Sequence, residues 1–495
     1  MTRTERTRVL AGAAAAVLLA GCSLTGGGTD PAPSDSPAPR PFTVMSTDRV
    51  RVTDPAAMTD ASSAMLALNV FQRLMTAAPG ESVLKPDAAR DCIFTAATTY
   101  TCTLNEDEAF HNGHPLTSSD VKFSIERAAR LNVAGSSAPL LSSLRRIETP
   151  DPLTVRFLLS RVDTQFGWAL ASPAASIVDE EVYDADEIRS REDPVVGSGP
   201  FSVTSLTEDE IGLQRYPDYQ GRNPTSLDAL VYRSVDDSAT IEDAMAKNTV
   251  DVVWRGLDEA AVTRLSQQAV NADATTATGF RQQVLTGTRV LQLEWSPDSR
   301  SRGTKALRTA IALALQGDRT SDSVVPGGVP GHVATFPLGG TTNPRVTWDN
   351  RINLTLGYDS TQPNGRDIAT QIRSRLEDTG GLSVQLRADE PGDLTLVDRK
   401  AWTATPLAWL QPYVEAPLPA SADAVATAES GYRATTTDDA ANQLLATLQE
   451  QAAADLVVLP VSQSDEYVYV GPGTDMSETS YGPGWQLGLF GISRG

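Results

Sequence analysis

The chain has 495 residues, which is enough for two or three domains. Hydrophobic residues make up 40% of it and charged residues 21%, as in an ordinary globular protein. The formal net charge of −21 argues against nucleic-acid binding, which requires a basic surface. We therefore expect no nucleic-acid partner, and we take a monomer as the default state.

The N-terminus has the pattern of an export signal. Three arginines precede an apolar run over residues 9–20, which is too short to span a bilayer as a stable helix. The run ends in Leu-Ala-Gly-Cys, which is similar to a bacterial lipobox. This predicts a signal peptide over residues 1–21, a lipidated Cys22, and anchoring to the outer face of the cytoplasmic membrane. The alternative is an ordinary signal peptide with a chance cysteine.

The next segment is a predicted tether followed by the start of the folded body. Residues 23–41 are rich in Gly, Ser and Pro, which is typical of a flexible linker. With Cys22 they form a predicted anchor region over residues 22–41. Residues 41–55 then indicate a first strand and a loop, and residues 61–75 indicate a helix.

The remaining two cysteines, Cys92 and Cys102, flank a stretch of high β-propensity. An exported protein meets oxidising conditions, so we expect a disulfide that closes a small hairpin. Such a bridge contributes about 2–3 kcal/mol, as short loops do. A catalytic thiol is the weaker alternative, because no Cys–His arrangement is evident.

The stretch EAFHNGHPLTSSDVKFSIERAAR, residues 108–130, predicts a strand end, a turn and a capped helix. Asn112-Gly113 is a tight-turn signal, and Thr117 with Asp120 fits a capping box. The two histidines of the turn could contribute to a metal site, but two ligands alone do not make one. We predict no metal and no cofactor.

The middle of the chain indicates several strands and short helices. The predicted strands cover residues 152–160, 201–206, 211–216, 230–235, 250–254 and 290–296, and the predicted helices cover residues 239–247 and 304–315. Asn248 stands where the first of these helices should end in left-handed geometry.

The last part of the chain contains a strand–helix–strand pattern. Its predicted strands are 352–358 and 382–386, with a helix over 367–376 between them, which implies parallel pairing and an α/β lobe. A further strand at 393–397, a helix at 438–454 and a strand at 456–461 complete the prediction.

Five motifs in order resemble the solute-binding proteins of family 5, the extracytoplasmic receptors of ABC importers for oligopeptides, dipeptides, nickel chelates and similar ligands. These motifs are AFHNGHPLTSSDVKFSIERA, GSGPFSV, LQRYPDYQGRNPTSLDALVYRSV, AMAKNTVDVVW and ALRTAIALALQGDR. The first carries Phe110, Gly113, Pro115, Leu116, Asp120 and Val121. Together they cover most of residues 42–386.

The resemblance implies an α/β fold of the periplasmic-binding-protein type, type II. Two lobes would be joined by a hinge, with an extra subdomain inserted in the first lobe. Lobe I would take residues 42–75, 195–285 and 455–495, the insert residues 76–194, and lobe II residues 286–454. The implied partners are a small solute, such as an oligopeptide, and the permease subunits of an ABC transporter.

One feature of the peptide-binding members is missing. They carry a Trp followed closely by Asp-Tyr in lobe II, and that Asp pairs with the α-ammonium of the peptide. Neither Trp402 nor Trp409 is followed by Asp at that spacing. For a free peptide to bind, Asp398 or Glu415 would have to take the place of that Asp. A buried ammonium without an anionic partner would be costly.

We expect the ligand to lie in the cleft between the lobes, and aromatic side chains suit such a site. The predicted ligand-binding residues are Trp254, Arg255, Asp398, Arg399, Trp402, Trp409 and Tyr413. For each tryptophan, packing in a core is the competing interpretation, and Asp398 and Arg399 could simply end a strand in solvent.

Two other functions compete with solute capture. A secreted hydrolase would need a nucleophile elbow or a zinc motif, and the sequence has neither; we predict no catalytic residues. A sensor or envelope-assembly lipoprotein with the same fold is the second alternative, motivated by a lobe II segment that looks shortened between Asp393 and Asp438.

Overall fold

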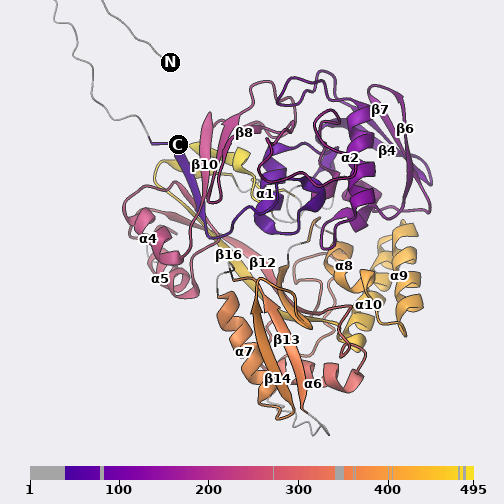
Figure 1. The fold of residues 1–495 in the computed structure, drawn as a ribbon, viewed down its shortest axis with the longest axis vertical. Helices are drawn as coiled ribbons and strands as arrows, with labels where there is room; N and C mark the ends of the chain where they lie inside the picture. Colours follow the sequence, from indigo (N-terminus) through magenta and orange to yellow (C-terminus); the bar gives the residue numbers. More distant parts are fainter. Residues whose placement is uncertain are drawn as a thin grey trace, which may run out of the picture. The chain divides into compact units, whose positions relative to one another are not determined.

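Figure 1 shows the computed structural model of the chain, which describes residues 40–77, 83–270, 273–340, 351–360, 362, 364–399, 401–403, 405–477, 480–482 and 486–495, without the side chains of 286, 288 and 289. The predicted signal peptide, Cys22 and residues 23–39 lie outside these ranges, so the lipid anchor stays a prediction. Within the part that is described, no helix combines the length and the apolar character needed to cross a membrane.

A mixed ten-stranded sheet runs through the unit formed by Pro41–Gly495. Its strand order is β14-β13-β15-β12-β16-β11-β1-β10-β9-β8. In chain order these strands are β1 (Phe42–Ser46), β8 (Phe201–Leu206), β9 (Glu210–Arg215), β10 (Ala229–Ser234), β11 (Val252–Trp254), β12 (Arg281–Trp295), β13 (Ile352–Tyr358), β14 (Leu382–Ala388), β15 (Leu394–Arg399) and β16 (Val458–Val470).

Two long strands connect the two ends of this sheet. Strands β12 and β16 pair with each other antiparallel; β16 also pairs with β11, and β12 also pairs with β15. The β12–β16 register shifts between Leu285 and Arg289, which is close to the predicted border of the lobes at residue 285. A bulge of this kind bends the strand locally. The division into two lobes remains our proposal. In it the chain returns from lobe II to lobe I within β16, because Val458 and Leu459 at the start of this strand pack in the core of lobe II.

Lobe I packs hydrophobic side chains on both faces of its strands. Val44 and Met45 are neighbours on β1 and point to opposite faces, as the pleat of a strand requires. Val44 packs in a core with helix α1 (Ala61–Val70), and Met45 packs in a core with α4 (Ser238–Ala246) and α5 (Glu259–Val270). Helix α1 ends at Val70, not at Met75 as predicted, because Phe71 is already extended.

The predicted strand–helix–strand unit of lobe II is confirmed. Helix α7 (Gly365–Glu377) connects β13 to β14, which pair in parallel from Ile352↔Leu382 to Tyr358↔Ala388. Figure 1 shows α7 beside these strands. The other helices of this lobe are α6 (Lys305–Leu315), α8 (Pro406–Glu415), α9 (Ala422–Ala434) and α10 (Asp438–Asp455).

The insert has its own sheet and its own core. The sheet order is β4-β5-β7-β6, with β4 (Ala89–Ala96), β5 (Thr99–Leu104), β6 (Leu144–Asp151) and β7 (Thr154–Leu159). Cys92 and Cys102 are directly opposite on β4 and β5 and form the predicted disulfide. Helix α2 (Ser118–Leu131) covers the sheet, and its buried residues Val121, Ile125 and Ala128 form the predicted apolar face.

The sequence predicted neither α5, α8 nor α9. The buried face of α5 consists of Ala261, Leu265 and Ala269. Because alanine is only weakly hydrophobic, the helical spacing of this face gives a weak signal in the sequence. Helix α8 contains Pro412, a residue that normally ends a helix, and it begins at a proline. Packing in the lobe II core therefore outweighs local propensity in this segment.

Candidate functional site

The turn before α2 is a structural element whose polar groups are satisfied by its neighbours. Phe110 donates its backbone N–H to the His114 carbonyl at 2.8 Å, and Gly113 takes the positive φ of +86° that the tight turn needs. Thr117 caps α2, and the reciprocal bonds of the capping box with Asp120 are both present. The most conspicuous motif of the sequence is thus explained by turn and cap chemistry, as predicted.

His111 is held between two segments of the chain. Its Nδ1 lies 3.3 Å from the donating N–H of Gly197, and its Nε2 lies 3.0 Å from the Gly199 carbonyl. Burial lowers the pKa of His111 to about 4, against an opposing effect of the hydrogen bond to Gly199. The ring is therefore neutral near pH 7, and it connects the insert to the start of β8.

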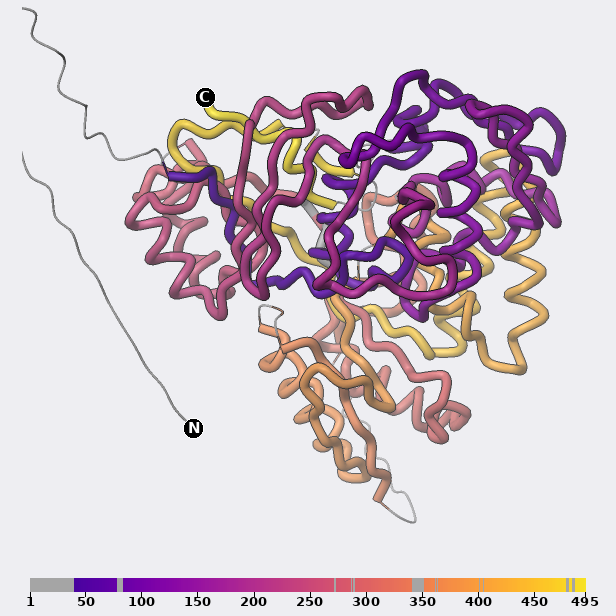
Figure 2. The backbone as a smooth tube through the Cα atoms, turned by 45° about the horizontal axis from the view of Figure 1, so that its top comes forward, coloured from indigo at the N-terminus to yellow at the C-terminus, as the bar shows by residue number. Residues whose placement is uncertain are grey.

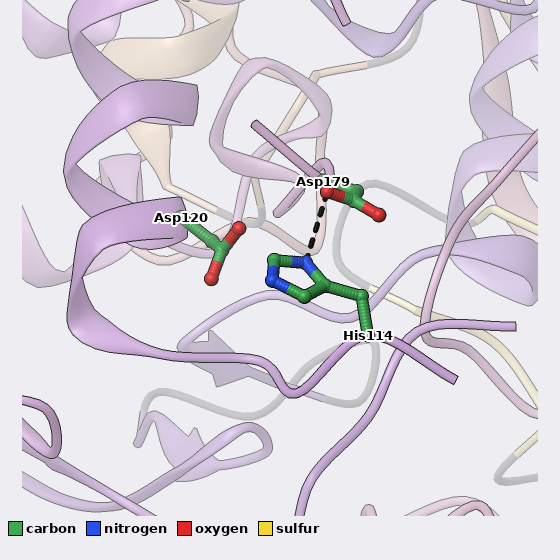
Figure 3. A group of neighbouring side chains, drawn as sticks. All are labelled: His114, Asp120 and Asp179. Atoms are coloured by element: carbon green, nitrogen blue, oxygen red, sulfur yellow. Dashed lines mark hydrogen bonds and ion pairs between the residues drawn. The ribbon is translucent and has the colours of Figure 1, made fainter. Parts of the chain in front are cut away.

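His114, Asp120 and Asp179 form a group whose side-chain oxygen and nitrogen atoms lie within 4.8 Å of one another (Figure 3). The Asp179 carboxylate accepts from His114 Nδ1 at 3.0 Å and from Asn112 at 2.7 Å. The Asp120 carboxylate accepts from the Thr117 N–H at 2.9 Å. Both carboxylates thus accept hydrogen bonds within the turn and the helix cap, which gives the group a structural role in this segment.

A pocket of about 580 Å³ lies between the predicted lobes. Lobe I contributes the segment after β1, the start of α1 and the residue after β11; lobe II contributes the ends of β13 and β14 and strand β15. The lining residues are Asp48, Arg49, Arg51, Thr59, Asp60, Ala61, Ser62, Ala134, Arg255, Tyr358, Asp359, Gln362, Asp389, Glu390, Pro391, Thr395, Leu396, Val397 and Asp398.

Arg255 lies at the centre of the contacts across this pocket. Its Nε lies 2.8 Å from Asp48 in lobe I, and its Nη2 lies 2.5 Å from Asp398 in lobe II. Burial disfavours the charge, but Asp48 and Asp398 outweigh it and hold the pKa of the guanidinium above its ordinary value. The ion pair therefore connects the two lobes in a buried environment, where a charge is stable only when paired.

The backbone of Arg255 is also unusual. Its φ is +53°, in the left-handed region that non-glycine residues seldom adopt. The next residue, Gly256, has φ +130°, and a Cβ there would lie 2.6 Å from the Thr47 nitrogen. Strain of this kind persists where the surrounding structure enforces it, often at ligand sites.

A second set of ion pairs crosses between the lobes at the edge of the pocket. Arg51 lies 3.0 Å from Asp359 and 3.9 Å from Asp389. These side chains are partly exposed, so the pairs contribute little to stability in water. Because these pairs cross the cleft, they form only when the two lobes lie close together.

The insert also contacts lobe II. Arg433, at the end of α9, pairs with Asp163 at 3.0 Å, and Thr164 donates its N–H to the Arg433 carbonyl at 2.8 Å. Figure 2 shows the insert, in purple, beside the light-orange α9. The insert therefore contacts lobe II, and its residue Ala134 lines the pocket.

Two carboxyl groups of the pocket resist ionisation. Burial raises the pKa of Asp48 above its ordinary value; Arg255 opposes this, and Asp398 and Asp359 add to it. Burial likewise raises the pKa of Asp60, against the hydrogen bonds that it accepts from Ser63. Both carboxyl groups are therefore harder to ionise in the pocket than they are in water.

The structure places the predicted ligand-binding residues in three environments. Arg255 and Asp398 line the pocket. Arg399, on the same strand as Asp398, pairs with Glu294 at 2.7 Å and does not line it.

The four aromatic residues are buried and do not line this pocket. Trp254 packs in a core of lobe I, Trp402 in the core of the insert, and Trp409 and Tyr413 in the core of lobe II. The Tyr413 hydroxyl donates to Asp455 at 2.7 Å, which satisfies it inside the core. The competing interpretation of core packing describes all four, and a ligand contact for them remains only a prediction.

Sequence reasoning missed most of the pocket. Asp48, Arg51 and Asp60 lie in a loop and at a helix cap, and Asp359 and Asp389 follow strands of lobe II. The available signal was topological: β13 and β14 are parallel, so polar residues that follow them share one edge of the sheet.

Comparisons with known proteins agree with this architecture. A family model described as bacterial extracellular solute-binding proteins, family 5 Middle, matches residues 84–346, more than half of the chain. The curated probable D,D-dipeptide-binding periplasmic protein DdpA of Escherichia coli K12 is 29% identical over 158 residues, which are 31% of this chain and 30% of DdpA. The chain thus spans less than a third of the length of that relative.

Solved structures match over nearly the whole chain. The binding protein AgaA of A. tumefaciens R10, in complex with agropinic acid, has a TM-score of 0.77 at 20% identity and covers 92% of this chain and 99% of its own. DppA of Helicobacter pylori, in complex with the peptide STSA, has a TM-score of 0.76 at 18% identity and covers 92% and 98%. These likenesses establish the predicted fold of periplasmic binding proteins, and the matched family model shows that the chain belongs to family 5 of the bacterial extracellular solute-binding proteins.

Proposed function

We propose that the protein captures a solute in the pocket between its two lobes and delivers it to the permease of an ABC importer, while a lipid on Cys22 anchors it outside the cytoplasmic membrane. The family is one of solute-binding proteins and not of enzymes, in agreement with the prediction from the sequence. The protein accordingly binds its solute without chemical conversion.

The pocket that both lobes line carries this proposal. The Arg255–Asp398 and Arg51–Asp359 pairs join lobe I to lobe II, and their residues line this pocket. Contacts that exist only when the lobes approach each other favour that state, and a solute that touches both lobes adds to them. A permease can then distinguish loaded from empty protein by the relative positions of the lobes.

The solute is peptide-like or of similar size. A volume of about 580 Å³ falls in the range of pockets for small molecules. Relatives with this fold were solved with a peptide and with agropinic acid, so the fold accommodates both kinds of ligand. This chain lacks the Trp–Asp-Tyr motif. The aspartates that line the pocket are therefore the groups that pair with a positive charge on the solute.

Native mass spectrometry of residues 23–495, purified without refolding, tests the proposal. We expect a small molecule bound at a ratio of one to one. Val397→Trp fills the pocket from β15 and should abolish the bound mass, whereas Ile188→Trp, at a side chain 49% exposed in the insert, should retain it. Equal retention by both variants would contradict binding in this pocket.

A further inference from the structure

A group of four charged side chains lies at the contact between the insert and lobe II. The insert contributes Arg161 and Asp163, from the segment between β7 and α3 (Phe166–Ala169), and α9 of lobe II contributes Glu429 and Arg433. Arg433 pairs with Asp163 at 3.0 Å, and Arg161 pairs with Glu429 at 3.2 Å. Both ion pairs therefore cross the contact.

Most of this group is shielded from water. The side chain of Asp163 is fully buried, that of Arg433 is 6% exposed and that of Glu429 is 11% exposed. Only Arg161, at 34%, is partly open to water. Solvent and salt therefore screen the Asp163–Arg433 pair less than they screen the exposed pairs of Arg51 at the edge of the pocket.

A backbone hydrogen bond and an apolar side chain join the same two parts of the chain. Thr164 donates its N–H to the Arg433 carbonyl at 2.8 Å, and its hydroxyl donates to the Thr435 carbonyl at 3.4 Å. Trp402, which follows β15 of lobe II, packs in the core of the insert. The contact thus combines ion pairs, a main-chain bond and hydrophobic packing.

The insert is joined to lobe I by buried bonds of its own. Arg127 of α2 donates to the two carboxylate oxygens of Asp54 at 2.8 and 2.6 Å, and both side chains are buried. Two such parallel bonds are strong and fix the geometry. His111 also donates its N–H to the Gly197 carbonyl at 2.8 Å. We therefore take the insert and lobe I as one body, whose contact with lobe II separates when the lobes open.

Each side of this contact retains partners when the other side leaves. Asp163 also accepts from the Ser143 hydroxyl at 2.6 Å and from the Gln165 N–H at 3.0 Å, both within the insert. Arg433 also pairs with Glu429 at 2.5 Å, one turn earlier in α9. Breaking a buried pair is costly when it leaves a charge uncompensated, and these partners reduce that cost. The contact is therefore suited to reversible opening.

We propose that the Asp163–Arg433 and Arg161–Glu429 pairs form a latch that holds the insert and lobe I against lobe II in the closed state. This inference rests on the proposed function, because closure of the lobes captures the solute. Apparent affinity falls in proportion as the binding-competent state is less populated. The latch therefore tightens solute binding through residues that do not line the pocket.

The Thr164 amide reports directly on the latch, because its hydrogen bond crosses the contact. The test measures its hydrogen exchange in residues 23–495 without added solute. Asp163→Asn and Arg433→Gln break the same pair from its two sides. Each should speed exchange at Thr164 about tenfold or more, as expected for a lost hydrogen bond between charged groups. Arg146→Ala, which breaks an exposed pair with Glu148 inside the insert, is the control and should leave Thr164 unchanged.

Two further amides distinguish opening of the latch from unfolding. The Ser160 N–H donates to the Ser143 carbonyl at 2.8 Å within the insert, and the His111 N–H bonds the insert to lobe I. Both should exchange as in the unmodified protein. Faster exchange at Ser160 in both variants would mean that the Asp163–Arg433 pair supports the fold of the insert and not closure. That result, or an unchanged rate at Thr164, would overturn the proposal.

Native mass spectrometry connects the latch to solute capture. A smaller fraction of Asp163→Asn and of Arg433→Gln should retain the co-purified small molecule than of the unmodified protein or of Arg146→Ala. Equal retention would contradict an effect of the latch on binding. If the folded, unmodified protein holds no small molecule, solute capture is contradicted, whereas exchange at Thr164 still decides whether the contact opens.

Discussion

The turn of residues 108–117 and the pocket between the lobes are both rich in charged and polar side chains, but these groups are satisfied in different ways. In the turn and cap, Thr117 and Asp120 bond over a separation of three residues. In the pocket, Arg255 meets Asp398 over 143 residues, and Arg51 meets Asp359 over 308. A motif that stands out in the sequence reports local structure, whereas the binding site depends on contacts that exist only when distant segments come together.

Replacing Phe110 by Ala should have the largest effect of these changes, and this effect should be on stability alone. Phe110 is fully buried in the core of the insert, so the change should lower the free energy of unfolding by about 3–5 kcal/mol. Urea unfolding measures this loss. Ile93→Ala, at a side chain 57% exposed, is the control and should have little effect. A loss of solute affinity in folded Phe110→Ala would remove the contrast between turn and pocket.

Acidification should act on the turn through His111. Its folded pKa of about 4 lies below the ordinary value of 6.5, so the unfolded chain binds the proton more tightly. Stability from neutral His111 is complete above about pH 6.5 and should fall by about 3 kcal/mol as the pH drops toward 4. Urea unfolding across this range should show a shallower loss in His111→Gln than in the unmodified protein.

His114 should show the opposite sign. Burial lowers its pKa, but Asp179, Asp120 and Glu181 outweigh burial and raise it above the ordinary value. Its contribution is therefore present below pH 6.5 and is lost as the pH rises through the folded pKa. His114→Gln should steepen the acid loss of stability, and the same pH profile in both variants would contradict the assigned environments.

Removing the disulfide should weaken the insert and leave the pocket intact. Cys92→Ser with Cys102→Ser opens a loop between residues ten apart in sequence, which should cost about 2–3 kcal/mol of stability. Thermal unfolding with and without reductant measures the effect on the unmodified protein and on the double variant. Sensitivity of the double variant to reductant would show that the bridge is not the cause.

The smallest expected effect on stability belongs to the cleft. Arg51→Ala should change the free energy of unfolding by less than about 1 kcal/mol, since its partners are partly exposed. It removes contacts between the lobes, so the unliganded protein should open and its radius of gyration in X-ray scattering should rise. Arg215→Ala breaks a similar exposed pair with Asp228 outside the pocket and should leave the radius unchanged. Equal radii for both variants would show that Arg51 does not hold the lobes.

The parts of the fold that the sequence predicted are those in which local chemistry decides. The capping box of Thr117, the parallel unit of β13 and β14 and the Cys92–Cys102 hairpin follow from side chains close together in the chain. Helix α8 was missed because packing overrides its internal Pro412. Distant contacts have no such local signal.

The candidate site shows the same limit. Arg255 and Asp398, two of the predicted ligand-binding residues, line the pocket. The tryptophans were selected for size and aromatic character, properties that suit a hydrophobic core equally well, and cores are where they lie. Asp48 and Asp60 were missed because only the fold brings them to the pocket.

Hydrogen exchange of the protein with and without its solute tests whether the solute is captured between the two lobes. We expect residues 48–62 of lobe I and residues 389–398 of lobe II to become protected together, while residues 108–117 exchange at the same rate in both states. Protection confined to residues 108–117, or to one lobe alone, would contradict capture of the solute between the lobes.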